Sequence, residues 1–227
     1  MLFRSVSGGG AGLCAARFSG VDVLPAGWEA TDVGGPALAG SARFDGLAWR
    51  VNGSGADIWG ASDQFHFARR HWEGDVTIVA RVASLSNTGD FAKAGVMIRD
   101  GAEPDAAYAL AFVTPDNPQP FAGSIMEVRG AAGASSQPVG GATGALAPGW
   151  LMLERSGDQF TASTSGDGVN WSSMGTATVS MEGPVEVGLA VTATNDGALN
   201  TAVFTEVSVG REQDRKSTRL NSSHANI

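Results

Sequence analysis

The chain has 227 residues, of which 43% are hydrophobic and 17% charged, and its formal net charge is −8. This length suits one large β domain, and the hydrophobic share is ordinary for a soluble globular protein rather than a disordered one. The acidic balance would repel a phosphate backbone, and no apolar run approaches the roughly 20 residues of a membrane-spanning helix. Composition therefore predicts neither a nucleic-acid partner nor membrane insertion.

The two ends of the sequence differ in composition from the middle. Cys14 is the only cysteine, which excludes an internal disulfide framework, a cysteine-based zinc site and a CxxC redox motif. The glycine-rich start is too weakly apolar for a signal-peptide core, so residues 1–20 are predicted to be a linker or a truncated leader. Residues 211–227 are predicted to be a disordered tail. Within it, residues 214–224 resemble the in-frame translation of a common sequencing-library adapter, so we interpret the tail as an artefact without function.

The remaining residues, 21–210, are predicted to form one folded domain. From Trp28 onward, apolar and polar residues alternate in short segments separated by Gly, Pro, Asn and Asp, which is typical of half-buried strands. In AKAGVMIRD (92–100), Val96 and Ile98 share one face, and Lys93 and Arg99 share the other. Strands at intervals of about 8 to 12 residues predict a sandwich of two antiparallel sheets.

Turn and loop signals separate these strands. SGD (156–158) and GDG (166–168) are predicted hairpin connections, because glycine supplies positive φ at little cost. In the second connection, Asp167 and Gly168 are expected to make the turn, with Trp171 packed back over it. Residues 130–149 carry few bulky side chains and are expected to be a long loop.

Five segments in chain order resemble a bacterial branch of the concanavalin A-like lectin/glucanase superfamily: GSGADIWGASDQFHF (53–67), GDVTIVARV (74–82), AKAGVMIRD (92–100), WLMLERSGDQFTASTSGDGVNW (150–171) and VGLAVTATNDGALNTAVF (187–204). That branch includes domains similar to the "regulation of enolase protein 1" group. The resemblance covers about residues 28–209 and implies an all-β jelly-roll sandwich of two antiparallel sheets, one of them concave. It also implies a domain that commonly lacks catalysis and binds carbohydrate or assists an attached enzyme, although fold alone does not fix function.

The sequence lacks the catalytic pattern of the superfamily's glucanases. Those enzymes typically carry E-x-D-x-x-E on one strand, because retaining hydrolysis needs two carboxylates on the same face. The nearest match begins at Glu73, but Ile78 stands in place of its third carboxylate. No G-x-S-x-G motif accompanies the histidines, so serine-hydrolase chemistry is not indicated either. We therefore predict no catalytic residue.

Residues of the segment 53–67 are candidates for a sugar-binding rim. The indole of Trp59 can stack on apolar sugar CH groups, and the carboxylates of Asp57 and Asp63 can accept hydrogen bonds from hydroxyls. The alternative is that both aspartates bond local backbone amides while Trp59 fills the edge of the core. His66 alternates with two phenylalanines and is expected to face a sheet surface, either as part of the site or as a structural histidine.

Charged residues on the predicted strands extend this candidate site. Lys93, Arg99, Glu127 and Arg129 would form a polar concave groove, with the arginines as planar donors to sugar hydroxyls or carboxylates. Alternatively, the cations are buried partners of the two aspartates above and orient the groove without touching a ligand. Glu127 has no carboxylate partner at a catalytic spacing, and its alternative is a surface or ion-paired glutamate.

No cofactor is expected to be required, although the resemblance is compatible with a calcium ion held between loops. Its candidate ligands are Asp32, Asn195 and Asp196, in the absence of a D-x-D-x-D loop.

We therefore predict a non-catalytic, lectin-like accessory module of a secreted, extracellular or cell-surface protein, with flanking domains in a longer chain. It would bind polysaccharide on its concave sheet through Asp57, Trp59, Asp63, His66, Lys93, Arg99, Glu127 and Arg129. Two alternatives stay open: a glycoside hydrolase or lyase with atypical catalytic residues, and a structural protein-interaction module.

Overall fold

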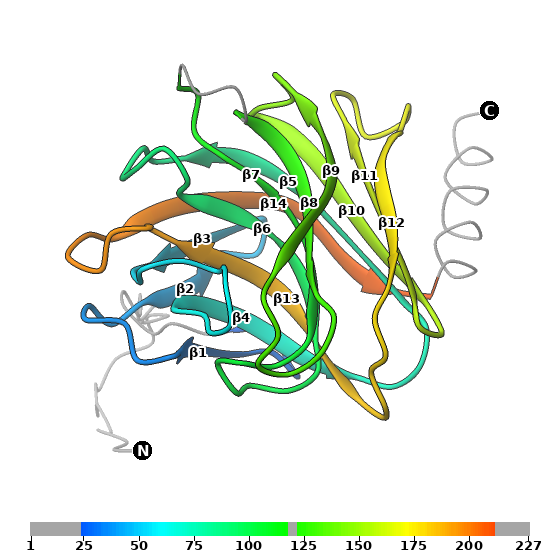
Figure 1. Cartoon of the computed structure of the whole chain (residues 1–227). Coiled ribbons are helices and arrows are strands. Elements are labelled where there is room, and N and C mark those ends of the chain that lie inside the picture. The colour runs from blue at the N-terminus through cyan, green and yellow to red at the C-terminus, as the bar shows by residue number, and fades with distance from the viewer. Residues whose placement is uncertain (1–23, 118–121, 212–227) are drawn as a thin grey trace, which may run out of the picture.

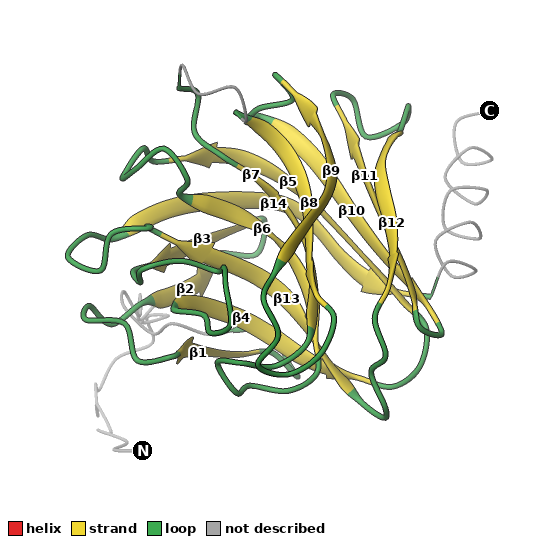
Figure 2. Ribbon diagram, viewed as in Figure 1, coloured by secondary structure: helices red, strands yellow, loops and turns green. Residues whose placement is uncertain are grey.

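The computed structural model describes residues 24–117 and 122–211, which form two β layers packed face to face (Figure 1). The predictions for residues 1–20 and for the tail beyond Arg211 lie outside the described residues. Every regular element in the described ranges is a strand (Figure 2), which confirms the all-β prediction. These ranges contain no helix long and apolar enough to cross a membrane.

Each layer is an antiparallel sheet of seven strands. In spatial order, the first sheet consists of β1 (Glu29–Val33), β4 (Phe65–Trp72), β13 (Val185–Thr192), β6 (Lys93–Arg99), β7 (Tyr108–Val113), β8 (Gly123–Arg129) and β9 (Gln137–Thr143). The second consists of β12 (Ser172–Thr178), β11 (Gln159–Ser165), β10 (Gly149–Ser156), β5 (Val76–Leu85), β14 (Asn200–Gly210), β3 (Ala48–Gly53) and β2 (Ser41–Phe44). Neighbours such as β4 and β13 are distant in sequence, so the chain crosses repeatedly between the layers, as the predicted jelly roll requires.

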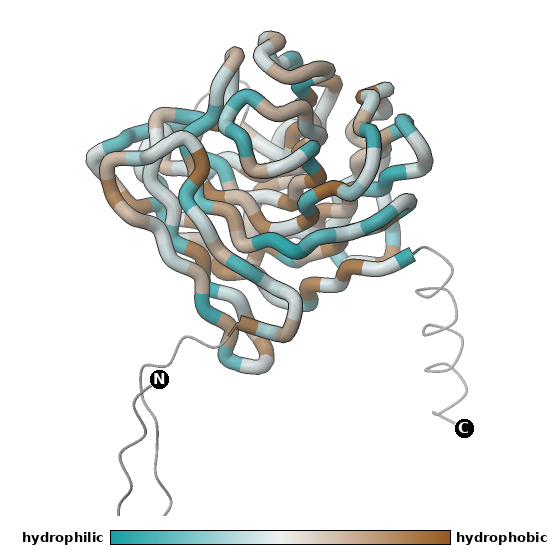
Figure 3. Tube along the Cα trace, turned by 90° about the horizontal axis from the view of Figure 1, so that it is seen from below, coloured by the Kyte–Doolittle hydropathy of each residue, from teal (hydrophilic) through white to brown (hydrophobic). Residues whose placement is uncertain are grey.

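Alternation along each strand decides which side chains fill the space between the sheets. Val96 and Ile98 of β6 belong to the same buried cluster as Ile78 of β5 and Phe204 of β14. The intervening residues of β6 therefore point away from the second sheet. Figure 3 shows the resulting mixture of hydrophobic and hydrophilic positions along the strands. The predicted assignment of faces on β6 is confirmed.

The outer face of the first sheet, meaning the face turned away from the second sheet, carries a second apolar cluster. Its strand residues include Phe65, Phe67, Met97, Tyr108, Leu110 and Phe112. Ile58 completes this cluster from the loop of residues 54–64, which joins β3 to β4 and is drawn in cyan in Figure 1. Because Ile58 is fully buried, this loop, named here the covering loop, is packed onto the sheet.

The stretch 130–149 contains β9, so the prediction of one long loop there was wrong. β9 pairs with β8 at the edge of the first sheet and is mostly exposed, which explains its low content of bulky residues. A Cβ on Gly140 would lie 2.2 Å from the carbonyl oxygen of Met174, so glycine permits the close approach of β9 to β12.

Both predicted hairpin connections are confirmed, since they join β10 to β11 and β11 to β12. Asp167 makes the second turn by accepting hydrogen bonds from the backbone amides of Val169 and Asn170, each at 2.8 Å. The sequence predicted Trp171 against this turn. The indole that lies against Gly168 is instead that of Trp150 on β10, since a Cβ added to Gly168 would be 2.8 Å from the Trp150 ring.

Candidate functional site

Asp63, near the end of the covering loop, is fully buried between two arginines. Its Oδ1 accepts a hydrogen bond from Arg129 Nη2 at 2.5 Å, and its Oδ2 accepts from Arg129 Nη1 at 2.7 Å and Arg99 Nη1 at 2.9 Å. Burial lowers the pKa of Arg99, and the charge of Asp63 opposes that shift. A carboxylate held by a bidentate arginine is a strong, directional contact. These three residues, named here the ion cluster, therefore fix the loop on the sheet.

Arg129 also positions the backbone around the exposed indole of Trp59. Its Nε and Nη2 donate to the carbonyl oxygen of Gly60 at 3.2 and 3.1 Å. Its Nη1 donates to the carbonyl oxygens of Pro104 and Ala106, each at 3.2 Å, in the connection between β6 and β7. Since Gly60 directly follows Trp59, one buried guanidinium holds the part of the loop that presents the indole.

A groove of about 690 Å³ opens on the outer face, between the covering loop and strands β6 to β9. Its walls are mostly apolar and are formed by Trp59, Phe91, Phe112, Ile125 and Pro138. Trp59 and Phe91 are 44% and 49% exposed, so their rings are open to a ligand. Exposed aromatic rings beside a groove offer flat surfaces to the apolar face of a bound molecule.

Lys93 on β6 is the one cation that lines the groove within the described part of the chain. Its ammonium pairs with the carboxylate of Asp57 and donates to the carbonyl oxygen of Ile58 at 3.1 Å. The same nitrogen lies 5.3 Å from the ring centre of Phe112 and 6.0 Å from that of Trp59. The charge of Lys93 is therefore compensated inside the protein by one carboxylate, one carbonyl and two aromatic faces.

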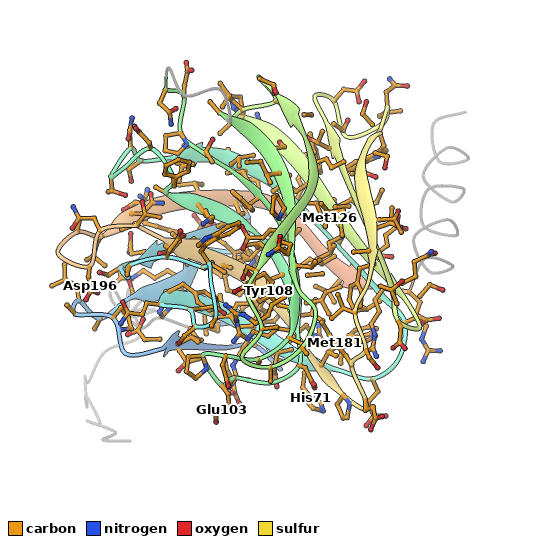
Figure 4. All side chains as sticks on the ribbon, in the orientation of Figure 1. His71, Glu103, Tyr108, Met126, Met181 and Asp196 are labelled. Carbon is orange, nitrogen blue, oxygen red and sulfur yellow. The ribbon has the colours of Figure 1, made fainter. Side chains whose placement is uncertain are left out.

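Glu127 on β8 is a second carboxyl group at the groove, and its side chain is almost completely buried. The hydroxyl of Tyr108, labelled near the middle of the molecule in Figure 4, donates to its Oε1 and lies 2.8 Å from Ser136 Oγ. Burial raises the pKa of Glu127 to about 7, against the opposing effects of Lys93 and the Tyr108 hydrogen bond. The hydrogen bond from Tyr108 is accepted by Oε1, and Glu127 lines the groove, so its carboxyl group adjoins the space that is open to a ligand.

The structure brings together half of the residues predicted to bind a ligand. Four of the eight line the groove: Asp57, Trp59, Lys93 and Glu127. The members of the ion cluster do not, since their side chains have no exposed surface. Their position matches the structural alternative, in which buried ion pairs orient the groove without touching a ligand.

His66 lies on the opposite face of β4 from the groove. It alternates with Phe65 and Phe67 as expected, but those rings occupy the outer face, so His66 points toward the second sheet. Its Nδ1 is 2.7 Å from Oδ1 of Asp32, and the residue is 3% exposed. A Cβ on Gly40 would be 2.3 Å from that ring. His66 therefore matches the structural alternative, with its ring between the two sheets rather than on an open sheet surface.

Several groove residues were missed in the sequence. Phe112 alternates with alanines in AYALAFVT, so pairing β7 beside β6 would have placed it on the same face as Lys93. Phe91 lies in the connection before β6, where no periodicity indicates its direction. Pro138 belongs to β9, a segment whose glycine-rich sequence predicts a loop.

The calcium candidates each have a local partner. Asp32 is hydrogen-bonded to the ring of His66, and Asp196 and Asn195 accept backbone N–H groups at 2.6 and 3.1 Å. Asp196 lies at the far left end of the molecule in Figure 4, well away from Tyr108. Residues 24–117 and 122–211 contain no group of three or more His, Cys, Asp or Glu side chains suited to a metal ion.

Comparison with known proteins shows what this fold is similar to. No family model matches the sequence, and no curated protein matches it. Among solved structures, the chain is similar to a functionally unknown protein from Saccharomyces cerevisiae, with a TM-score of 0.63, 17% identity, and coverage of 80% of this chain and 96% of that one.

Two solved lectin-fold structures are also similar. Basic winged bean lectin with Tn-antigen has a TM-score of 0.51 and 8% identity, over 81% of this chain and 91% of that one. The exoplasmic/lumenal domain of VIP36, in a Ca²⁺/Man3GlcNAc-bound form, has a TM-score of 0.50 and 12% identity, over 82% and 84%. At such identities the likeness concerns the fold. The chain therefore has a lectin-like jelly-roll sandwich fold of two antiparallel sheets.

Proposed function

We propose that this protein is a non-catalytic carbohydrate-binding module that holds a glycan in the groove on the outer face of the first sheet. The observation that carries the proposal is the exposed indole of Trp59 beside two carboxyl groups, Asp57 and Glu127. Sugar CH faces stack on aromatic rings, and sugar hydroxyls donate to carboxylates. The likeness to lectin folds supports the same assignment at the level of architecture. In this proposal the module belongs to a longer secreted or cell-surface protein.

The experiment is binding of the full chain to a panel of soluble and insoluble polysaccharides, with and without calcium. Trp59→Ala is expected to weaken binding by about thirtyfold, because truncating a central aromatic anchor costs on the order of 2 kcal/mol. The control is Leu47→Ala, which removes an 85% exposed side chain outside the groove and should leave affinity unchanged. Absence of binding across the panel would overturn the proposal.

The second candidate is a glycoside hydrolase or lyase that uses the same groove. It is favoured by the presence of Asp57 and Glu127 on one groove and by the pKa of Glu127 near 7, which suits a general acid. Asp57, however, is already paired with Lys93. The discriminating assay is release of reducing ends or unsaturated products from every polysaccharide that binds. Product formation abolished by Glu127→Gln would establish the enzyme, and binding without products would leave the module.

A further inference from the structure

We infer that the groove selects uncharged glycan segments and discriminates against uronic acids and other anionic sugars, because its cation is already neutralised by Asp57. This inference rests on the proposed function and specifies the ligand class of the same site. It follows from the positive charges near the groove, the carboxyl groups that line it and the apolar walls.

The positive charge of Lys93 is directed into the protein. Its side chain is 5% exposed, and its ammonium is held by the Asp57 carboxylate and the Ile58 carbonyl. An anionic sugar would have to displace the carboxylate of Asp57, which the folded chain already holds against the ammonium. Such a preformed pair is therefore a poor receptor for a second anion.

The two arginines beneath the outer face are also unable to receive an anionic sugar. Arg99 and Arg129 are fully buried, and both are hydrogen-bonded to Asp63. Arg99 Nε donates to the carbonyl of Gly101 at 2.9 Å, and the remaining donors of Arg129 are directed to loop carbonyls, such as that of Gly60. Their charge is used to hold the covering loop, so no guanidinium is offered to the groove.

The groove also carries two carboxyl groups, those of Asp57 and Glu127. Asp57 Oδ1 takes the ammonium of Lys93 and the amide of Ile58, whereas Oδ2 has no partner among the described residues and the side chain is 30% exposed. The carboxyl group of Glu127, whose Oε1 accepts the hydrogen bond from Tyr108, also lines the groove. A ligand hydroxyl can donate to Oδ2 of Asp57, whereas a ligand carboxylate would meet the negative charge of Asp57 and, above about pH 7, that of Glu127 as well.

The walls favour the same class of ligand. Trp59, Phe91 and Phe112 present aromatic rings, and Ile125 and Pro138 add aliphatic surface. A pyranose with CH groups on one face buries apolar area against such walls, and its hydroxyls remain at the ring edge to reach the acceptors. A charged substituent would lose hydration there without gaining a partner.

The test uses pairs of glycans that share a backbone and differ in charge: cellohexaose with its C6-oxidised form, and mannohexaose with the corresponding mannuronic acid oligomer. The wild-type chain should bind the neutral member at least about tenfold more tightly, because like charges across an interface are strongly disfavoured. Its affinity for the neutral member should not change between low and high salt, since no charge pair with the ligand is formed.

The variant Asp57→Asn removes the partner of Lys93 and keeps the shape of the side chain. This variant should bind the acidic glycans more tightly. The ratio of its affinity for the neutral glycan to its affinity for the acidic glycan should fall by about tenfold. Asp158→Asn makes the same charge change in the exposed turn between β10 and β11, outside the groove, and should leave the ratio unchanged. Thermal unfolding would confirm that both variants are folded.

The outcomes separate this inference from the proposed function. Wild-type binding of the acidic member that equals or exceeds that of the neutral one would overturn the charge selection and leave the glycan-binding module standing. An unchanged ratio in a folded Asp57→Asn variant would do the same. If Asp57→Asn does not fold, the wild-type ratio and its salt dependence still decide. Failure of both classes to bind, together with the wider panel, would overturn the proposed function and the charge selection with it.

Discussion

The carboxyl group of Glu127 makes the stability of the protein depend on pH in a way that one substitution can isolate. The side chain is 2% exposed, and burial disfavours its ionised form, which raises its pKa from 4.5 to about 7. Lys93 and the hydroxyl of Tyr108 favour the ionised form but do not offset the burial. The folded protein therefore keeps a proton that the unfolded chain releases between these two values.

The sign and size of the effect follow from this difference. Below pH 4.5 the carboxyl group is protonated in both states, so its stabilising contribution is fully present. As the pH rises through about 7 the contribution is lost, because the ionised group is then buried. The pKa of Glu127 rises from 4.5 in the unfolded chain to about 7 in the folded protein. At about 1.4 kcal/mol per pKa unit, this difference lowers the free energy of unfolding by about 3 kcal/mol as the pH rises.

The variant Glu127→Gln replaces the titrating group by a neutral one that can still accept the hydrogen bond from Tyr108. Urea unfolding of both proteins from pH 4.5 to 8 gives the difference in unfolding free energy at each pH. That difference should shift by about 3 kcal/mol in favour of the variant as the pH rises. Glu182→Gln, at an exposed position, is the matched control and should retain the wild-type pH dependence. A difference curve that is flat within about 0.5 kcal/mol would refute the reasoning.

Two further predictions concern stability, and each has a clear measurement. Asp63→Ala should lower the free energy of unfolding by about 3–5 kcal/mol, because it leaves two buried arginines without their carboxylate; a loss below about 1 kcal/mol in urea unfolding would contradict the role of the ion cluster. Gly53→Ala should cost at least about 2 kcal/mol, since the added Cβ would lie 2.0 Å from a carbonyl oxygen of β13, whereas Gly166→Ala meets no atom within 4 Å and should change stability by less than about 0.5 kcal/mol. Similar melting temperatures for these two glycine variants would show that the approach of β3 to β13 is not tight.

The faces of the strands could be predicted from the sequence because they depend on a local rule. Side chains alternate across a strand, so Val96 had to oppose Lys93 whatever the rest of the chain did. The same rule puts Lys93 and Arg99 on one face of β6. It could not say whether such a face is open or covered, since that depends on a loop distant in sequence.

The covering loop is the feature that local patterns could not reveal. It buries Arg99 and Arg129 by bringing Asp63 onto them, and it leaves Trp59 exposed only a few residues earlier. The hydrogen bonds from Arg99 and Arg129 to Asp63 join residues that are separated in the sequence by 36 and 66 positions. The edge strand β9 could not be predicted for a different reason. Its glycines allow neighbouring backbones to approach closely, and a glycine-rich segment shows no hydrophobic alternation.

The central claim, that the groove holds a glycan, is tested most directly by NMR titration of the isotope-labelled full chain with a neutral oligosaccharide that it retains. The amides of Lys93, Phe112 and Glu127 and the indole N–H of Trp59 should shift together with one dissociation constant, while the amide of His66, on the other face of β4, should not move. Shifts confined to another surface, or no shifts at saturating oligosaccharide, would contradict the assignment of the groove.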